Sequence, residues 1–277
     1  MSPFELAEPS TLAQAVSLLD AENARPLSGG TALMLMMKAG VLRPARLVSL
    51  RKLGLDGIQV DGELRIGAMT SLRALERSDQ VKTGWPVIAR ALRTLSNVRV
   101  RNVATVGGAL AHADPHMDLP PLLAALGAQA TIAGPRGERT LPVEALYAGY
   151  LDNTLARDEL ITQVRVPQMG KARAAYLKCT TRSADDWPAV GMAVVIDGAD
   201  VRVVLGAATD KPTRLVGAEK ALKGSDLSDP GILRQAADAA AAEVAVEGDQ
   251  HGSADYKKQL IRVYLQRTLH EARRPSH

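Results

Sequence analysis

Residues 97–120 read NVRVRNVATVGGALAHADPHMDLP, and this stretch decides how the rest of the sequence is interpreted. Apolar and polar residues alternate well enough from Val98 to Val106 to predict an extended segment. The pair Gly107-Gly108 is expected to break that segment. Asp118 precedes a Leu-Pro-Pro sequence, which predicts a helix over Leu119–Leu126 with Asp118 as its N-cap.

A second glycine pair lies upstream, in Ser28-Gly29-Gly30-Thr31, between a short extended piece and a predicted helix over Leu33–Lys38. Glycines lack Cβ atoms, so consecutive backbone N–H groups in such loops are able to converge on an anion. The loop Thr105-Val106-Gly107-Gly108 has a similar composition. Neither loop is a Walker loop or a Gly-x-Gly-x-x-Gly turn. The two interpretations that remain are phosphate-binding loops and simple tight turns.

Charge placement favours the phosphate-binding interpretation. Residues 80–113 contain no Asp or Glu and five basic residues, a local net charge of +5 beside the second glycine pair. The five are Lys82, Arg90, Arg93, Arg99 and Arg101. Such a charge suits a diphosphate, so a nucleotide cofactor is the leading hypothesis. The alternative for Arg90 and Arg93 is a solvated helix face.

The residues that follow have the spacing of a metal site. His112, Asp114, His116 and Asp118 would line one face of an extended chain, and His with carboxylate is a common set of zinc ligands. Pro115 interrupts the pattern, and helix capping gives Asp118 another role. No metal ligand is therefore predicted.

Composition excludes several other classes of protein. The chain has 277 residues, one cysteine and a net charge of +4, and its aromatic content is 3%. Cys179 alone makes no disulfide and holds no iron–sulfur cluster. The mild charge and few aromatic residues argue against a nucleic-acid-binding surface. Neither an export signal nor an apolar run of about 20 residues occurs, so a soluble, cytoplasmic protein is expected.

Helix and strand signals are mixed without regular alternation, so an α+β fold is expected. Helical spacing occurs around residues 12–19, 33–38, 70–76, 87–95, 232–246 and 254–272. Strand-like segments occur at residues 46–50, 58–60, 64–67, 129–132, 160–166, 174–178, 191–196 and 201–205. Asp61-Gly62 is a hairpin signal. The sequence changes character near Gly170, which predicts a domain boundary there.

The order and spacing of several motifs resemble those of one family, the FAD-binding medium subunits of molybdenum hydroxylases. Xanthine dehydrogenase and aerobic carbon monoxide dehydrogenase are enzymes of this group. The motifs are the stretch 97–120, Leu27–Thr31, Pro3-Phe4, Ile66-Gly67-Ala68-Met69-Thr70, Lys178 with Arg182 and Asp185-Asp186, Ala218-Glu219, and Ser253-Ala254-Asp255-Tyr256. The resemblance spans nearly the whole chain. It implies a vanillyl-alcohol-oxidase-type FAD-binding domain over residues 1–169, with lobes of about 1–55 and 56–169. A smaller α+β domain over residues 170–277 would follow.

The resemblance implies that the two loops grip the FAD diphosphate from two sides. The implied contacts are Leu27, Ser28, Gly29, Gly30, Thr31, Ala32 and Leu33 in the first loop and Thr105, Val106, Gly107, Gly108 and Ala109 in the second. Relatives often carry Asn at the position of Ala109 and a polar or acidic residue at that of Ala32. Backbone contacts are therefore expected to matter more than side chains.

Four further residues are implied near the cofactor. Asp118 would contact sugar or ribityl hydroxyls, Leu95 and Ile161 would touch the flavin, and Lys178 would lie beside it. For Leu95 and Ile161 the alternative is simple burial in the core. For Lys178 it is a salt bridge to one of the carboxylates at 185 and 186.

A subunit of this kind receives electrons from [2Fe–2S] clusters on a small partner and passes them from FADH2 to an external acceptor. A large partner would hold the molybdenum cofactor, and the assembly would be a dimer of heterotrimers without nucleic acid or a membrane span. Two clusters need eight thiolates, which agrees with clusters on another chain. No catalytic residue is predicted here. The alternatives are a stand-alone FAD-dependent oxidoreductase and a non-enzymatic nucleotide-binding module.

Overall fold

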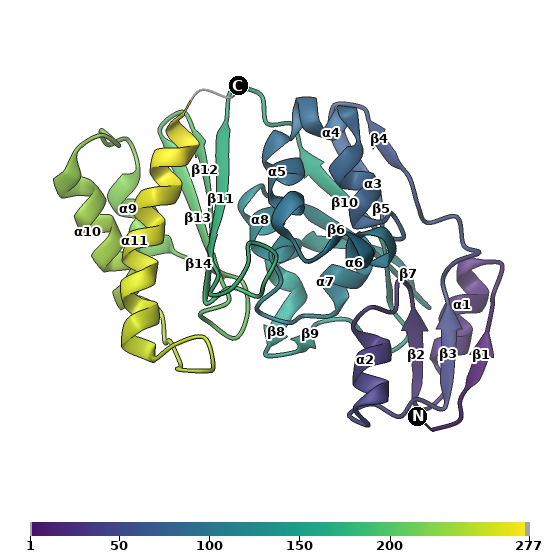
Figure 1. Ribbon diagram of the computed structural model, residues 1–277. Coiled ribbons are helices and arrows are strands. Elements are labelled where there is room, and N and C mark those ends of the chain that lie inside the picture. The colour runs from purple at the N-terminus through teal and green to yellow at the C-terminus, as the bar shows by residue number, and fades with distance from the viewer. Residues whose placement is uncertain (1, 275–277) are drawn as a thin grey trace.

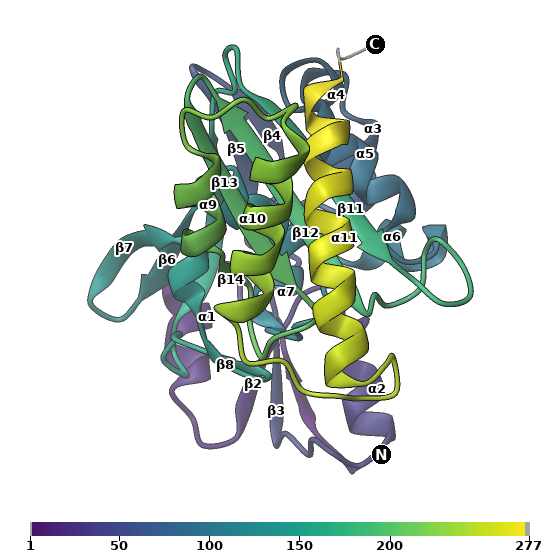
Figure 2. The same cartoon turned by 90° about the vertical axis from the view of Figure 1, so that its left-hand side faces the viewer.

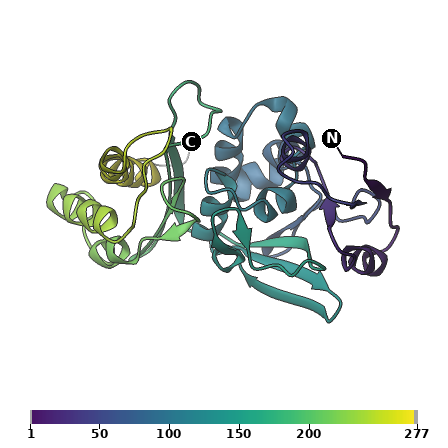
Figure 3. The same ribbon diagram turned by 90° about the horizontal axis from the view of Figure 1, so that it is seen from below.

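The computed structural model describes residues 2–274 as three sheet-based parts in a row (Figures 1 and 3). The first is a parallel sheet in the order β1-β3-β2, formed by Glu5–Ala7, Arg46–Ser49 and Ala24–Leu27. Helices α1 (Leu12–Leu19) and α2 (Leu33–Lys38) accompany it. The first glycine loop therefore leaves the carboxyl end of β2 and leads into α2.

The middle part is an antiparallel sheet in the order β4-β5-β10-β6-β7. Its strands are Ile58–Val60, Glu63–Gly67, Leu160–Pro167, Gln129–Gly134 and Gly137–Pro142. Asp61-Gly62 forms the predicted hairpin between β4 and β5, with Gly62 at φ +67°. A 3₁₀ turn over Val143–Leu146 and the short strands β8 (Tyr147–Gly149) and β9 (Asp152–Asn153) follow β7.

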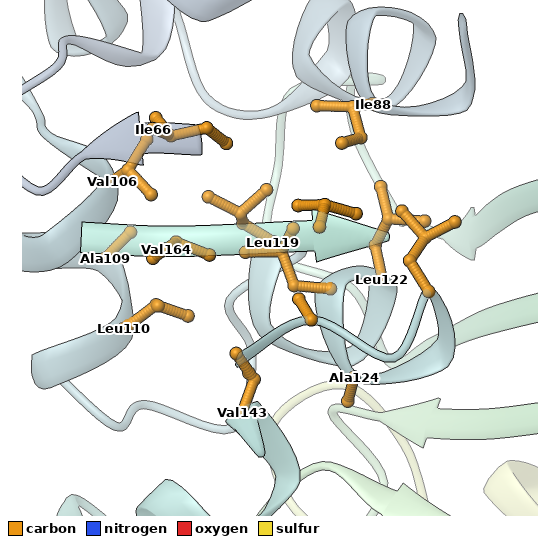
Figure 4. Packing of buried hydrophobic residues seen from close by; sticks show 14 of the residues in the cluster. Ile66, Ile88, Val106, Ala109, Leu110, Leu119, Leu122, Ala124, Val143 and Val164 are labelled. Carbon is orange, nitrogen blue, oxygen red and sulfur yellow. The ribbon is translucent and has the colours of Figure 1, made fainter. Parts of the chain in front are cut away.

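Six short helices cover one face of the middle sheet. They are α3 (Leu72–Arg77), α4 (Asp79–Gly84), α5 (Pro86–Thr94), α6 (Val98–Val103), α7 (Val106–Ala111) and α8 (Leu119–Ala125). Ile66 and Val164 of the sheet pack against Val106, Leu110 and Leu119 of these helices (Figure 4). This core holds α7 and the start of α8, and with them residues 97–120, in fixed positions.

The C-terminal part is an antiparallel sheet in the order β11-β12-β13-β14 with helices on one face (Figure 2). The strands are Arg173–Cys179, Val190–Asp197, Asp200–Gly206 and Thr213–Arg214, and the helices are α9 (Val216–Leu222), α10 (Pro230–Ala242) and α11 (Ala254–Arg273). Ala193 and Val204 point from the other face of this sheet into the core of the middle part. Helix α8 therefore lies between the two sheets. No helix within residues 2–274 is long and apolar enough to cross a membrane.

The expected α+β architecture is confirmed, but the extended segment predicted over Val98–Val106 is wrong. The segment forms α6 and the start of α7. The Asn97 side chain accepts a hydrogen bond from the N–H of Val100, and the Thr105 side chain accepts one from the N–H of Gly108. These two N-caps start a helical turn each, and packing on α3 and the middle sheet outweighs the weak helix preference of valine.

Candidate functional site

The two glycine loops lie against one another in the wall of a pocket of about 480 Å³ that is lined by residues of the first and middle parts. Eleven of the residues predicted to bind the cofactor line it: Ser28, Gly29, Gly30, Thr31, Ala32, Leu33, Thr105, Gly107, Gly108, Ala109 and Ile161. The fold thus brings together two loops that lie more than 70 residues apart in the sequence. Their hydroxyls meet directly, with Ser28 Oγ 2.9 Å from Thr105 Oγ1.

The first loop offers free hydrogen-bond donors to this pocket. Within residues 2–274, the five N–H groups of residues 29–33 donate no hydrogen bond. Gly30 is at φ +71°, a left-handed conformation that glycine adopts without steric cost. Ala32 does not cap α2 with its side chain. A run of free amides beside a pocket is the arrangement that binds phosphate oxygens, so this loop fits a diphosphate.

The second loop is different, because three of its four amides, those of Val106, Gly107 and Gly108, are already bonded within the chain. Thr70 O accepts from Val106 N at 3.0 Å, and Ala68 O accepts from Gly107 N at 2.8 Å. Thr105 Oγ1 accepts from Gly108 N at 3.1 Å. The expectation that these amides converge on a diphosphate is therefore not met.

The glycines of both loops instead permit very close packing. A Cβ atom on Gly107 would lie 2.6 Å from the Cβ atom of Ala68, and one on Gly108 would lie 2.7 Å from Ser28 Oγ. A Cβ atom on Gly29 would lie 2.2 Å from the carbonyl oxygen of Val103. The glycines thus let α6 and α7 approach the first loop more closely than any side chain would allow.

Leu27, Leu95 and Val106 do not line the pocket. Leu95 and Val106 are buried in the core of the middle part, and the Leu27 side chain packs beside Gly30. Ile161 is both a core residue and part of the pocket wall. The alternative of simple core burial is thus the one observed for Leu95.

Asp118 and Lys178 form a buried ion pair, with Nζ 2.9 Å from Oδ2. The other carboxylate oxygen accepts a 2.6 Å hydrogen bond from the hydroxyl of Tyr176. Lys178 Nζ also donates to the carbonyl oxygens of Thr94 at 2.9 Å and Asp186 at 3.1 Å. Burial raises the pKa of Asp118, although the Lys178 ammonium and the Tyr176 hydroxyl both oppose the shift.

Two sequence-based interpretations of this pair need correction. Asp118 does occupy the N-cap position of α8, but its side chain makes no capping hydrogen bond, because its carboxylate oxygens are engaged by Lys178 and Tyr176. The lysine does not pair with the carboxylate of Asp185 or Asp186, since Asp186 contributes only its backbone carbonyl. The partner lies 60 residues earlier in the chain, and nothing in the local sequence indicates it.

The basic residues between 80 and 113 do not line the pocket. Arg101 is buried and donates to Glu76 Oε2 at 2.9 Å, and Lys82 pairs with Asp79 at 2.8 Å. The basic residues that do line it are Arg25 and Arg157. Arg25 could have been predicted from its position in the strand that precedes the first glycine loop.

The His/Asp segment is not extended, because Ala113 has φ +55°. Asp114 accepts hydrogen bonds from the backbone N–H of His116 and from its ring Nδ1, and this ring stacks on Trp187 at 5.5 Å. Within residues 2–274, no group of three or more His, Cys, Asp or Glu side chains is placed to hold a metal ion. Burial lowers the pKa of His112, and Asp114 opposes the shift.

Two family models match the sequence. The first, described as the FAD binding domain in molybdopterin dehydrogenase, matches residues 2–169. The second, described as the CO dehydrogenase flavoprotein C-terminal domain, matches residues 175–272.

Similar proteins of known identity include the carbon monoxide dehydrogenase medium chain of Afipia carboxidovorans, 33% identical over 98% of this chain and 96% of that protein. The glyceraldehyde dehydrogenase medium chain of Sulfolobus acidocaldarius is 29% identical over 97% of this chain and 98% of its own. A chain of carbon monoxide dehydrogenase from Hydrogenophaga pseudoflava, solved in a form that lacks the Mo-pyranopterin moiety, superimposes with a TM-score of 0.93. It is 33% identical, and 98% of each chain is covered.

Proposed function

The chain belongs to the family of FAD-binding domains in molybdopterin dehydrogenases, and on this premise we propose that it is the electron-transfer subunit of a molybdenum hydroxylase complex. The observation that carries the proposal is the first glycine loop, in which the five N–H groups of residues 29–33 have no hydrogen-bond partner among the residues that the structure describes, and these residues line a pocket. FAD, when bound, supplies redox chemistry that takes up electrons singly and releases them to an acceptor.

The residues of this chain bind and orient the cofactor. The amides of residues 29–33 hold the diphosphate, and the hydroxyls of Ser28 and Thr105 keep the two loops together. Ala109, Ile161 and Leu33 supply apolar walls. Leu27, Leu95 and Val106 lie outside the pocket lining and support its walls by packing, and the Asp118–Lys178 pair, also outside the lining, holds the C-terminal part beside the pocket. Residues 1–169 form the FAD-binding domain in two lobes, and residues 170–277 the C-terminal domain.

The electron donors and acceptors lie outside this chain. Two [2Fe–2S] clusters on a small partner deliver electrons to FAD, and a large partner holds the molybdenum cofactor and oxidises the substrate. Cys179 is the single thiol of the sequence, which fits clusters ligated elsewhere. The complex is a dimer of heterotrimers in the cytoplasm, and FADH2 passes electrons to an external acceptor. No acid–base group of this chain is required.

This function is tested by purifying the tagged chain after co-expression with the proteins encoded by its neighbouring genes. We expect one FAD per chain, together with iron and molybdenum in the co-purifying subunits. Stopped-flow mixing of the oxidised complex with substrate should bleach the cluster and flavin bands together. Bleaching of the flavin by substrate in the isolated chain would instead indicate a stand-alone flavoenzyme. A nucleotide-binding module is indicated if neither preparation contains flavin.

A further inference from the structure

A short segment of the middle part places acidic and basic side chains against those of the C-terminal part. Within residues 2–274, two contacts between acidic and basic side chains join residues before 170 to residues after it: Asp118–Lys178 at 2.9 Å and His116–Asp249 at 3.4 Å. Both come from residues 114–118, here named the linking segment. Its Pro115 also accepts a backbone hydrogen bond from Ala207 at 2.9 Å. The C-terminal part packs on the middle part through apolar contacts of Ala193 and Val204, and the linking segment adds side-chain pairs and a backbone hydrogen bond to that packing.

The Asp118 end of the linking segment is enclosed more tightly than the rest. The side chains of Lys178 and Asp118 are 6% and 7% exposed. The Tyr176 hydroxyl lies where a Cβ atom on Gly191, on the adjacent strand β12, would come within 2.5 Å of it. Glycine at position 191 therefore leaves the space that lets this hydroxyl reach Asp118.

The linking segment is also continuous with the wall of the FAD pocket. Met117 lines the pocket from within the segment, and Ala111 and His112 line it at the end of α7. Helix α7 begins in the second glycine loop, whose packing against the first loop depends on contacts shorter than a side chain permits. Because closely packed elements move as units rather than deform, a shift of the linking segment would shift this wall.

We propose that Tyr176 is a positioning residue for the FAD pocket, acting through Asp118 and Lys178. By holding the Asp118 carboxylate, the tyrosine fixes the C-terminal part on the linking segment and keeps the pocket wall in place. Cofactor binding and docking of the C-terminal part therefore stabilise one another, and such coupling is reciprocal. This inference rests on the proposed function, because it takes the pocket to be the FAD site.

The test compares two tyrosines, one with and one without a hydrogen-bond partner. Tyr176→Phe removes the hydroxyl that holds Asp118. Tyr147→Phe is the control, because Tyr147 is buried and its hydroxyl has no hydrogen-bond partner within residues 2–274. The Kd for FAD is measured on the full chain by flavin fluorescence. Hydrogen exchange of residues 173–187 is measured with and without FAD.

We expect Tyr176→Phe to raise the Kd for FAD about tenfold, as loss of a hydrogen bond to a charged group does. FAD should slow exchange over residues 173–187 in the wild type and in Tyr147→Phe, and much less in Tyr176→Phe. Asp118→Asn should raise the Kd as well, and adding Tyr176→Phe to it should cause little further change, because the two residues act in one chain of contacts.

The proposal is overturned if Tyr176→Phe binds FAD as tightly as Tyr147→Phe, or if it lowers thermal stability without changing the Kd or the FAD-dependent exchange. In both cases the wild type still binds FAD, and the proposed function stands. If the wild type and the Tyr147→Phe control bind no FAD, the proposed function fails, and this inference fails with it.

Discussion

Ser28-Gly29-Gly30-Thr31 and Thr105-Val106-Gly107-Gly108 both combine two glycines with a threonine, and each lies at the start of a six-residue helix. In the first loop the amides of residues 29–31 have no partner in the described part of the chain, and Gly30 has a positive φ. In the second loop the amides of Val106, Gly107 and Gly108 are bonded to Thr70, Ala68 and Thr105. The first loop therefore provides donors, whereas the second provides close packing that holds the first in place.

Gly29→Ala should give the largest effect, because Gly29 is where the first loop touches the backbone at the end of α6, just before the second loop. The new Cβ atom would lie 2.2 Å from Val103 O, and a backbone carbonyl has no rotamer with which to move away. We expect a loss of about 3 kcal/mol in the free energy of unfolding and a rise of more than about 100-fold in the Kd for FAD.

Urea denaturation and fluorescence titration measure the two quantities. Gly84→Ala is the matched control, since a Cβ atom there meets nothing within 4 Å. If Gly29→Ala behaves like Gly84→Ala, the loops are not packed as described.

Gly30→Ala tests the donor role of the first loop. Holding an L-residue in the left-handed region costs about 1–2 kcal/mol of conformational free energy. If the backbone relaxes to relieve this strain, the neighbouring N–H groups no longer point into the pocket. We expect the Kd for FAD to rise about tenfold. Gly62→Ala has a similar φ, +67°, in an open hairpin far from the pocket. It should lose similar stability and keep its FAD affinity, so equal FAD affinities in both variants would contradict the donor role.

Thr105→Val removes the N-cap of α7 and the hydroxyl contact between the loops. Loss of such a cap costs about 1 kcal/mol. Ser28→Ala removes only the inter-loop contact and should cost about half as much. Thermal denaturation of both single variants and the double variant gives the coupling between the hydroxyls. Fully additive losses would mean that the 2.9 Å contact contributes nothing.

The smallest expected effect is a pH dependence of the free energy of unfolding. It comes from His112, which follows the helix that begins in the second loop. Burial lowers the pKa of His112, with Asp114 opposing, so the unfolded chain binds a proton near pH 6.5 while the folded chain does not. Stability is therefore retained above that pH and lost as the pH falls below it. Urea titrations from pH 8 to 5.5 should show a steeper loss for the wild type than for His112→Gln. If the free energy of unfolding falls equally with pH in both proteins, His112 does not contribute to the pH dependence.

Much of the fold was predictable because most elements follow from local pattern. The strand over 58–60, the hairpin turn at Asp61-Gly62 and the helix over Leu33–Lys38 agree with the structure. The helices over 98–111 were missed, since a valine-rich alternating segment favours strand and only the Asn97 and Thr105 caps indicate helix. Capping side chains deserve more weight than alternation in segments this short.

The site was predictable as two loops but not in its internal chemistry. The glycine pairs and Ile161 do line one pocket. Two amides of the second loop are occupied because they donate to the carbonyl oxygens of Ala68 and Thr70, which lie on a distant segment of the chain. The pairing of Asp118 with Lys178 likewise depends on how the C-terminal part docks. Such long-range pairings leave no local signal in a single sequence.

The most direct test of the central claim is an NMR titration of the isotope-labelled full chain with ADP, which carries the diphosphate of FAD without the flavin. The amide resonances of Gly29, Gly30 and Thr31 should move downfield as they gain hydrogen bonds to phosphate oxygens. Those of Gly107 and Gly108 should move much less, because they keep their partners within the chain. Large shifts at Gly107 and Gly108, with the first loop unchanged, would contradict the account.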